Sequence, residues 1–94
     1  MRVSAVEELI LDHLSSRAMY GLELVTISKG RLKRGTVYVT LQRMEEKGYI
    51  ESHQQPATPR AGGLPRRLYR PTALGRRVLA AAHAFNRILR PEHA

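Results

Sequence analysis

Apolar residues recur at intervals of three and four along most of this chain, the spacing of helices that bury one face. The clearest case is residues 33–48, where Val37, Leu41 and Met44 form one stripe and Gly48 ends the pattern. This pattern predicts an amphipathic helix with a basic entry. Its flanking faces carry short or planar polar side chains, namely Thr36, Thr40, Gln42 and Arg43.

A first helix is predicted upstream, over roughly residues 4–16. Ser4 and Glu7 have the Ser-x-x-Glu spacing of a capping box, in which each side chain satisfies the other residue's amide. Val3 and Leu11 fall outside the main stripe, so we expect them to face a second surface, such as a subunit partner. The main stripe itself consists of Val6, Leu9, Ile10 and Leu14.

A second, shorter helix begins at Tyr20-Gly21 and ends near Gly30, which suits a left-handed C-terminal position. A basic turn over residues 31–34 then leads into the third helix. Two close helices joined in this way match a helix-turn-helix, although a generic three-helix bundle gives the same pattern. The expected core positions of the second helix are Leu22, Val25 and either Leu24 or Ile27.

The pattern becomes extended after Gly48. Residues 49–55 and 66–70 indicate two strands, and residues 56–65 between them form a loop rich in Pro and Gly. A hairpin directly after a helix-turn-helix is the wing of a winged helix. We therefore predict a mainly α (α+β) fold, with a winged helix-turn-helix over residues 1–71 and a C-terminal dimerisation helix over residues 72–94, in one compact unit.

The last helix is expected to begin at Pro71-Thr72, with Thr72 as N-cap and close packing at Gly75. Its apolar face is broader than one small core needs, so we predict a homodimer through this helix. The alternative is that the face only closes the core of the monomer. The predicted dimer seam has the 4-3-4 spacing of a two-helix contact and consists of Val78, Ala82, Phe85 and Leu89.

Composition excludes several classes of protein. The chain has no Cys, which removes disulfides, thiolate nucleophiles and Cys-type zinc sites. Its His residues are scattered without the spacing of metal ligands, and it has no phosphate-binding Gly loop. We therefore expect no enzyme activity, no cofactor and no metal. The sequence shows no signal-peptide pattern and no membrane span, so a cytoplasmic protein without a membrane partner is expected.

The charge is unevenly distributed along the chain. The formal net charge is +8, yet residues 1–51 hold eight Lys or Arg against seven Asp or Glu. Residues 52–94 hold eight Arg against Glu92 alone. A one-sided basic half favours a polyanionic partner, because neutralising phosphates releases condensed counterions. A merely solvated basic surface is the other interpretation.

Three motifs follow one another in a fixed order within roughly residues 9–79. They are Tyr20-Gly21-Leu22-Glu23-Leu24, the Gly-Thr-x-Tyr-x-x-Leu-x-Arg pattern that begins at Gly35, and the Tyr-x-x-Thr-x-x-Gly pattern from Tyr69 to Gly75. In order and spacing they resemble the PadR family of bacterial winged-helix transcriptional regulators. The resemblance implies a dimeric DNA-binding repressor on a two-fold operator, with the third helix in the major groove and the wing on the backbone.

Two departures from the family pattern affect these expectations. Pro71 stands where the family commonly has an apolar residue, so the second wing strand is expected to be shortened. The chain has no Trp, and Phe85 is the only late aromatic residue. That composition argues against an aromatic-lined cavity for inducers, and it leaves regulation by the protein's own abundance or by an unknown small-molecule or protein effector.

We predict that double-stranded DNA is contacted from the third helix and the wing. Thr36, Thr40 and Arg43 lie about one turn apart and are the candidates to read bases, since Arg pairs bidentately with guanine. Arg43 could instead pair with Glu45 or Glu46 on the helix surface. The full set of predicted DNA contacts is Lys33, Arg34, Thr36, Tyr38, Thr40, Arg43, Arg60, Arg66 and Arg67.

The sequence also allows a rival function. Winged helices also serve as protein- or RNA-interaction modules without operator specificity, and fold alone does not fix function. RNA binding would favour exposed stacking aromatics. The four Tyr residues instead fall at predicted element starts and core edges: Tyr20, Tyr38, Tyr49 and Tyr69.

Overall fold

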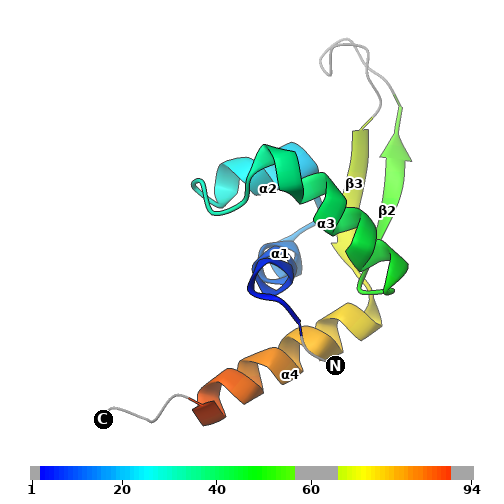
Figure 1. Cartoon of the computed structure of the whole chain (residues 1–94). Helices are drawn as coiled ribbons and strands as arrows, with labels where there is room; N and C mark the ends of the chain where they lie inside the picture. Colours follow the sequence, from blue (N-terminus) through cyan, green and yellow to red (C-terminus); the bar gives the residue numbers. More distant parts are fainter. Residues whose placement is uncertain (1–2, 57–65, 90–94) are drawn as a thin grey trace.

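The protein is a small helical domain with a sheet along one side (Figure 1). The computed structural model describes residues 3–56 and 66–89, and these form four helices and a three-stranded antiparallel sheet. The predicted winged helix-turn-helix with a C-terminal helix is confirmed. In chain order the elements are α1 (Ala5–Ser16), β1 (Met19–Tyr20), α2 (Gly21–Ile27), α3 (Arg34–Glu46), β2 (Ile50–Gln55), β3 (Arg66–Pro71) and α4 (Ala73–Leu89).

The predicted capping box begins α1 and also ties it to α3. The Glu7 amide donates to Ser4 Oγ at 3.1 Å, and the Ser4 amide donates to Glu7 Oε1 at 2.9 Å. The other Glu7 oxygen accepts from Lys47 Nζ at 2.6 Å, just beyond the end of α3. Burial acts to raise the pKa of Glu7, but the hydrogen bonds from Lys47 and Ser4 outweigh it and lower the pKa below its usual value.

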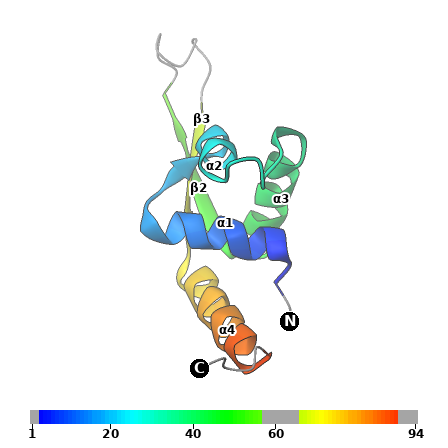
Figure 2. The same cartoon turned by 90° about the vertical axis from the view of Figure 1, so that its left-hand side faces the viewer.

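The core draws on every helix and strand, and α1 is buried on more sides than its predicted stripe suggested. Leu11 is fully buried, so the expectation that it faces a subunit partner is wrong. Val6, placed on the stripe, is 39% exposed. The reason is tertiary: α3 and β3 pack on one side of α1 and α4 packs on another (Figure 2). The buried apolar residues are Ile10, Leu11, Leu14, Met19, Leu24, Leu32, Val37, Leu41, Met44, Tyr49, Ile50, Tyr69 and Leu79.

Of the core positions expected in the second helix, Leu24 is confirmed and Leu22 is not. Leu24 is fully buried, whereas Leu22 and Ile27 are exposed and Val25 is only partly buried. With seven residues, α2 has room for one narrow face against α3 and the sheet. Its end is formed as predicted, because Gly30 has a left-handed φ of +90°.

The sheet has the order β1-β3-β2, with β3 in the centre. The short strand β1 was not predicted; it pairs Met19 with Tyr69, between the first two helices. Pro71 does not shorten the wing, since it is the last residue of β3 and lies opposite Ile50. Proline is tolerated here because the position is at the strand's end, where one missing amide costs little.

The last helix starts where expected. It lies on the opposite side of α1 from α2 and α3 (Figures 1 and 2). Thr72 is its N-cap, with the Gly75 amide donating to Thr72 Oγ1 at 3.0 Å. The close packing predicted at Gly75 is confirmed, since an added Cβ would lie 2.0 Å from the carbonyl oxygen of Tyr49. Val78 and Leu79 pack against the domain core, while Phe85, Ile88 and Leu89 are exposed.

Candidate nucleic-acid interface

The third helix offers an exposed, basic N-terminus. Lys33 is extended at φ −93° and caps the helix by backbone alone, and the first turn contains no acidic residue. Lys33, Arg34, Gly35 and Thr36 are all exposed. Free amides at a helix N-terminus and the positive end of the helix dipole both attract phosphate. The apolar stripe of α3 (Val37, Leu41 and Met44) is buried as predicted, so this basic end is held rigidly.

Gly35 has no role in packing within the described chain. A Cβ added there would meet no atom within 4 Å, and its backbone is helical rather than left-handed. Glycine in a helix costs up to about 1 kcal/mol relative to Ala. The fold alone therefore gives no reason for glycine at this exposed position.

The three predicted base-reading residues lie along one side of α3, with Thr40 partly buried and Thr36 and Arg43 exposed. Thr40 Oγ1 donates to the Thr36 carbonyl at 3.0 Å, and Thr36 Oγ1 to the Lys33 carbonyl at 3.4 Å. With the hydroxyl protons used internally, these side chains present methyl groups and acceptor lone pairs outward.

The ion pair considered for Arg43 is absent from the described part of the chain. Glu45 accepts instead from Ser52 Oγ, at 3.0 and 2.9 Å to its two oxygens. No described carboxylate lies within 4 Å of Arg43. Within the described residues its five N–H donors have no protein partner, so its guanidinium can bind a ligand.

Tyr38 packs against α2 and still leaves much of its surface exposed. Its ring packs on Gly21, where an added Cβ would lie 2.5 Å from Tyr38 Cε1. The residue is nevertheless 45% exposed. The ring also borders a hollow of about 360 Å³ between α2, α3 and β3, lined by Tyr20, Gly21, Leu22, Glu23, Tyr38, Arg66, Arg67 and Tyr69.

The two wing arginines point to opposite faces of β3, as expected for successive residues of a strand. The Arg66 guanidinium lies 3.9 Å from the centroid of the Tyr20 ring, a stacking contact that restricts its rotamers. Arg67 Nε donates to Ser52 Oγ at 2.9 Å. Tyr69 is buried beside the core, and burial raises the pKa of its hydroxyl above the ordinary value.

Arg60, predicted at the tip of the wing, lies outside the described residues. The hairpin and α3 lie toward one end of the molecule, and α4 lies at the opposite end (Figure 1). The predicted contact residues of α3 and β3 are thus brought to the same end of the domain. This end carries exposed cations from both elements: Lys33, Arg34, Arg43, Arg66 and Arg67.

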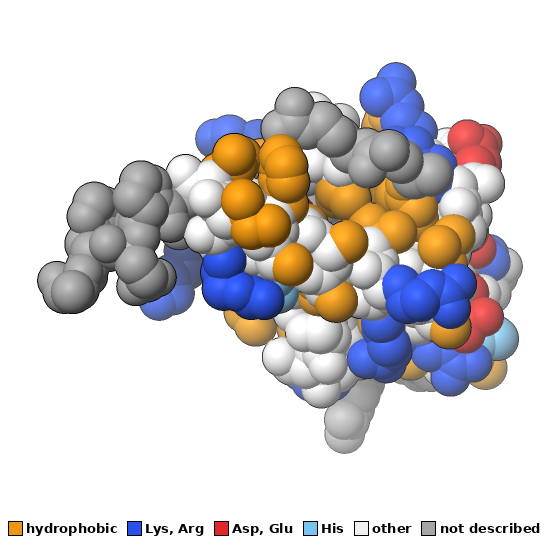
Figure 3. Space-filling view, turned by 90° about the horizontal axis from the view of Figure 1, so that it is seen from below, with side chains coloured by type: hydrophobic (Ala, Val, Ile, Leu, Met, Phe, Trp, Pro, Cys, Tyr) orange, Lys and Arg blue, Asp and Glu red, His pale blue; other side chains and the backbone are white. Residues whose placement is uncertain are grey.

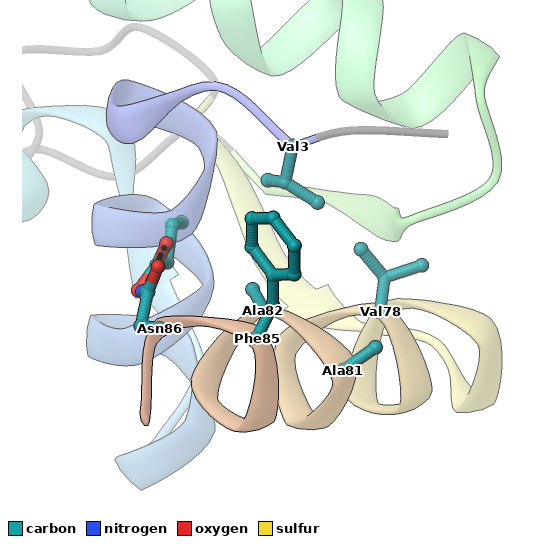
Figure 4. A pocket seen from close by; sticks show the side chains of 7 residues that line it. Val3, Val78, Ala81, Ala82, Phe85 and Asn86 are labelled. Carbon is teal, nitrogen blue, oxygen red and sulfur yellow. Dashed lines mark hydrogen bonds between the residues drawn. The ribbon is translucent and has the colours of Figure 1, made fainter. Parts of the chain in front are cut away.

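The opposite end of the molecule carries the predicted dimer seam. Val78 and Ala82 are half-buried, while Phe85 is 46% and Leu89 59% exposed. Apolar side chains run across this underside (Figure 3). A groove of about 550 Å³ separates α4 from α1, and Phe85 and Val3 point toward one another across it (Figure 4).

Sequence reasoning missed several residues at this groove. Ala81 and Asn86 line it, and Glu8 belongs to its wall. Glu8 is one turn from Asp12, which marks a shared face of α1, but only the tertiary structure brings His83 to the same place. His83, which lies far from these carboxylates in the sequence, has a ring nitrogen within 4.8 Å of a carboxylate oxygen of Glu8 and of Asp12.

Comparison with known proteins assigns the chain to a group. Residues 10–81 match the model of the "Transcriptional regulator PadR-like family". No curated protein matches the chain significantly. No helix among the described residues is long and apolar enough to cross a membrane.

Solved structures of similar fold include two family members at 29% identity. A PadR family transcription regulator from hypervirulent Clostridium difficile R20291 has a TM-score of 0.78, with 92% of this chain and 91% of that chain covered. A PadR family transcriptional regulator from Eggerthella lenta DSM 2243 has a TM-score of 0.76, with 89% and 73% covered.

A third structure, Bacillus subtilis PadR in complex with operator DNA, shares 17% identity and therefore supports the fold alone. Its TM-score is 0.73, and the match covers 96% of this chain but 50% of that one. The family match spans most of the chain, and the winged-helix fold agrees with it. The chain belongs to the PadR-like family of DNA-binding transcriptional regulators.

Proposed function

We propose that this regulator is a sequence-specific repressor that binds a two-fold operator as a homodimer. The observation that carries the proposal is the state of α3: its apolar stripe is buried, whereas Arg43 is exposed and has no acidic partner among the described residues. An unpaired guanidinium on a rigid helix is prepared for the bidentate contact with guanine that reads sequence.

The proposed division of labour follows from position on α3 and the wing. Arg43, Thr36 and Thr40 face base edges in the major groove, with the threonine methyl groups suited to thymine. Lys33 and Arg34 hold phosphates at the helix N-terminus, joined by Tyr38 through its hydroxyl. On the wing, one of Arg66 and Arg67, which point to opposite faces of β3, contacts the backbone, and Arg60, predicted at the tip, completes the set.

The homodimer is proposed through α4. Three large apolar side chains (Phe85, Ile88 and Leu89) are 46%, 79% and 59% exposed, more than a small soluble domain usually leaves uncovered in one place. A second copy of α4 against the Val78, Ala82, Phe85 and Leu89 seam would cover them. Because α4 lies beyond α1 from α3, such a dimer leaves both α3 helices free.

Operator binding is proposed by analogy of fold, since the Bacillus subtilis neighbour was solved in complex with operator DNA. Repression follows physically if the dimer covers a promoter that polymerase needs. A cytoplasmic location, where the chromosome lies, is part of the same proposal.

The test begins with selection of bound fragments from the host genome, followed by footprinting on the recovered sites. We expect two protected half-sites about one helical turn, roughly 34 Å, apart. Equal affinity for every duplex at fixed salt would contradict the proposal. A reporter driven by the recovered promoter should be silenced by the protein, whereas increased expression would identify an activator.

A protein- or RNA-interaction module is the competing function. Stacking on single-stranded RNA needs exposed aromatic rings. Tyr49 and Tyr69 are buried, and the Tyr20 ring is covered by Arg66. Tighter binding to single-stranded RNA than to duplex DNA of the same sequence would favour the competing function.

A further inference from the structure

A polar cluster joins α1 to α4 at the edge of the groove. Glu8 and Asp12 are one turn apart on α1, and His83 and Asn86 face them from α4. His83 Nε2 lies 3.0 Å from Asp12 Oδ1. Asn86 Nδ2 donates to both Glu8 oxygens, at 3.4 and 3.2 Å. Segments some seventy residues apart in sequence are thus linked by two polar contacts.

The donor atoms are spaced closely enough to share a cation. One ligand atom from each of Glu8, Asp12 and His83 lies within 4.8 Å of the other two. Bonds of about 2.0–2.1 Å to a tetrahedral ion place ligands roughly 3.3 Å apart. The Asp12–His83 pair is already near that separation, and the Glu8 carboxylate needs a shift of about 1.5 Å at most.

The electrostatic setting is unusual for so basic a chain. Among the described carboxylates, Glu7, Glu23 and Glu51 each pair with a Lys or Arg. Among the residues that the structure describes, neither Glu8 nor Asp12 has a Lys or Arg within 4 Å, although the net charge is +8. Two carboxylates beside an imidazole and an amide therefore hold local negative charge that a cation would neutralise.

The cluster is open to solvent, and a hydrogen bond orients one of its carboxylates; both features suit ion binding. The His83 and Asp12 side chains are 44% and 43% exposed, so an ion can enter and keep water on its open positions. The Asn86 amide holds the Glu8 carboxylate in orientation, as outer hydrogen bonds do for ligands of known metal sites.

We propose that Glu8, Asp12 and His83 bind a divalent transition-metal ion, with Zn²⁺ the best match to one imidazole and two carboxylates. The alternative is a plain His–Asp ion pair. Imidazole selects against Mg²⁺ and Ca²⁺, which take oxygen ligands. The ion replaces the hydrogen bond between Asp12 and His83 with two metal bonds.

Metal binding would fix the angle between α4 and the winged helix. This consequence rests on the proposed function, in which α4 carries the dimer seam and so sets the distance between the two α3 helices. A fixed angle holds the two α3 helices of the dimer at the separation that the half-sites require. We therefore expect Zn²⁺ to raise operator affinity.

The direct test is titration of the chelator-treated full chain with ZnCl₂ by calorimetry, without DNA. We expect saturable binding of one Zn²⁺ per chain and none of Mg²⁺ under the same conditions. His83→Ala and Asp12→Asn should each weaken binding at least about tenfold, and Asn86→Ala should weaken it by about tenfold. The matched control is His53→Ala, an exposed histidine in the wing at the far end of the molecule.

Two results would contradict the proposed metal site: no saturable Zn²⁺ binding, or an equal loss of Zn²⁺ affinity in His53→Ala and His83→Ala. If His83→Ala does not fold by circular dichroism, Asp12→Asn, which keeps the side chain's size, decides the question. Operator binding by the metal-free protein tests the proposed function separately. Operator affinity that Zn²⁺ leaves unchanged in the wild type would overturn the regulatory consequence.

Discussion

Two amphipathic helices of this protein, α3 and α4, differ in the face that they expose. The helix α3 exposes its polar face, and the last turns of α4 expose their apolar face. In α3 the apolar stripe is almost completely covered by its own chain, with Val37, Leu41 and Met44 no more than 1% exposed. In α4 Leu79 is buried, whereas Phe85 and Leu89 in the last turns are 46% and 59% exposed. The face a helix leaves uncovered indicates its partner: a polar and basic face suits a polyanion, and an apolar face suits protein.

The largest expected effect is on the α4 side. In a two-fold dimer, Phe85→Asp places one carboxylate from each subunit in the seam. It also removes one aromatic side chain from each subunit, and burial of each is worth about 1.5–3 kcal/mol. We expect the dimer to dissociate at micromolar concentration in sedimentation velocity. Leu22→Asp is the matched control, since Leu22 on α2 has a similar exposure of 44%. A Phe85→Asp variant that stays dimeric would move the interface elsewhere.

On the α3 side, Arg43→Ala should cost about 1–3 kcal/mol on the operator and relax specificity at one base position. Lys33→Ala, its control, should weaken all duplexes alike and reduce the slope of log affinity against log salt by about one. Competition binding with single-base operator variants at several salt concentrations measures both. If both variants lost affinity equally for every operator sequence, Arg43 would not read a base.

Gly35→Ala should separate stability from binding. Adding a Cβ at an open helical position should stabilise the fold by about 0.4–1 kcal/mol in urea unfolding. If DNA approaches the start of α3 closely, the same methyl group should weaken binding to every duplex. Gly75→Ala is the contrasting variant, because its Cβ would collide with the Tyr49 carbonyl and destabilise the fold. Unchanged DNA affinity in Gly35→Ala would argue against a close approach there.

The smallest effect concerns Glu7, which ties α1 to the end of α3. Its folded pKa is lowered from the ordinary 4.5, so its ionised form is favoured by folding. That stabilisation is present above about pH 4.5 and is lost as the pH falls through the folded pKa. Glu7→Gln should therefore melt lower than the wild type at pH 7 and show a smaller difference near pH 3. If Glu7→Gln lowers the melting temperature by the same amount at pH 7 and near pH 3, ionisation of Glu7 does not contribute to stability.

The periodicity of the sequence determined much of this protein. It predicted all four helices, the capping box at Ser4 and Glu7 and the N-cap at Thr72, because these depend on neighbours within a few residues. The close packing at Gly75 was also predicted, although its partner, the Tyr49 carbonyl, comes from a distant part of the chain. The family followed from local motifs such as the Gly-Thr-x-Tyr pattern at Gly35. The contact roles assigned to α3, the wing and the α4 seam remain proposals.

Only the tertiary structure decided which apolar residues are covered and which polar groups meet. Leu11 is buried and Val6 exposed because α4 returns to cover α1, a contact that no local pattern encodes. The strand β1 forms only because β3 lies beside Met19 and Tyr20. His83 reaches Asp12 for the same reason: a helix period fixes which residues share a face, but the crossing of two helices fixes which faces meet.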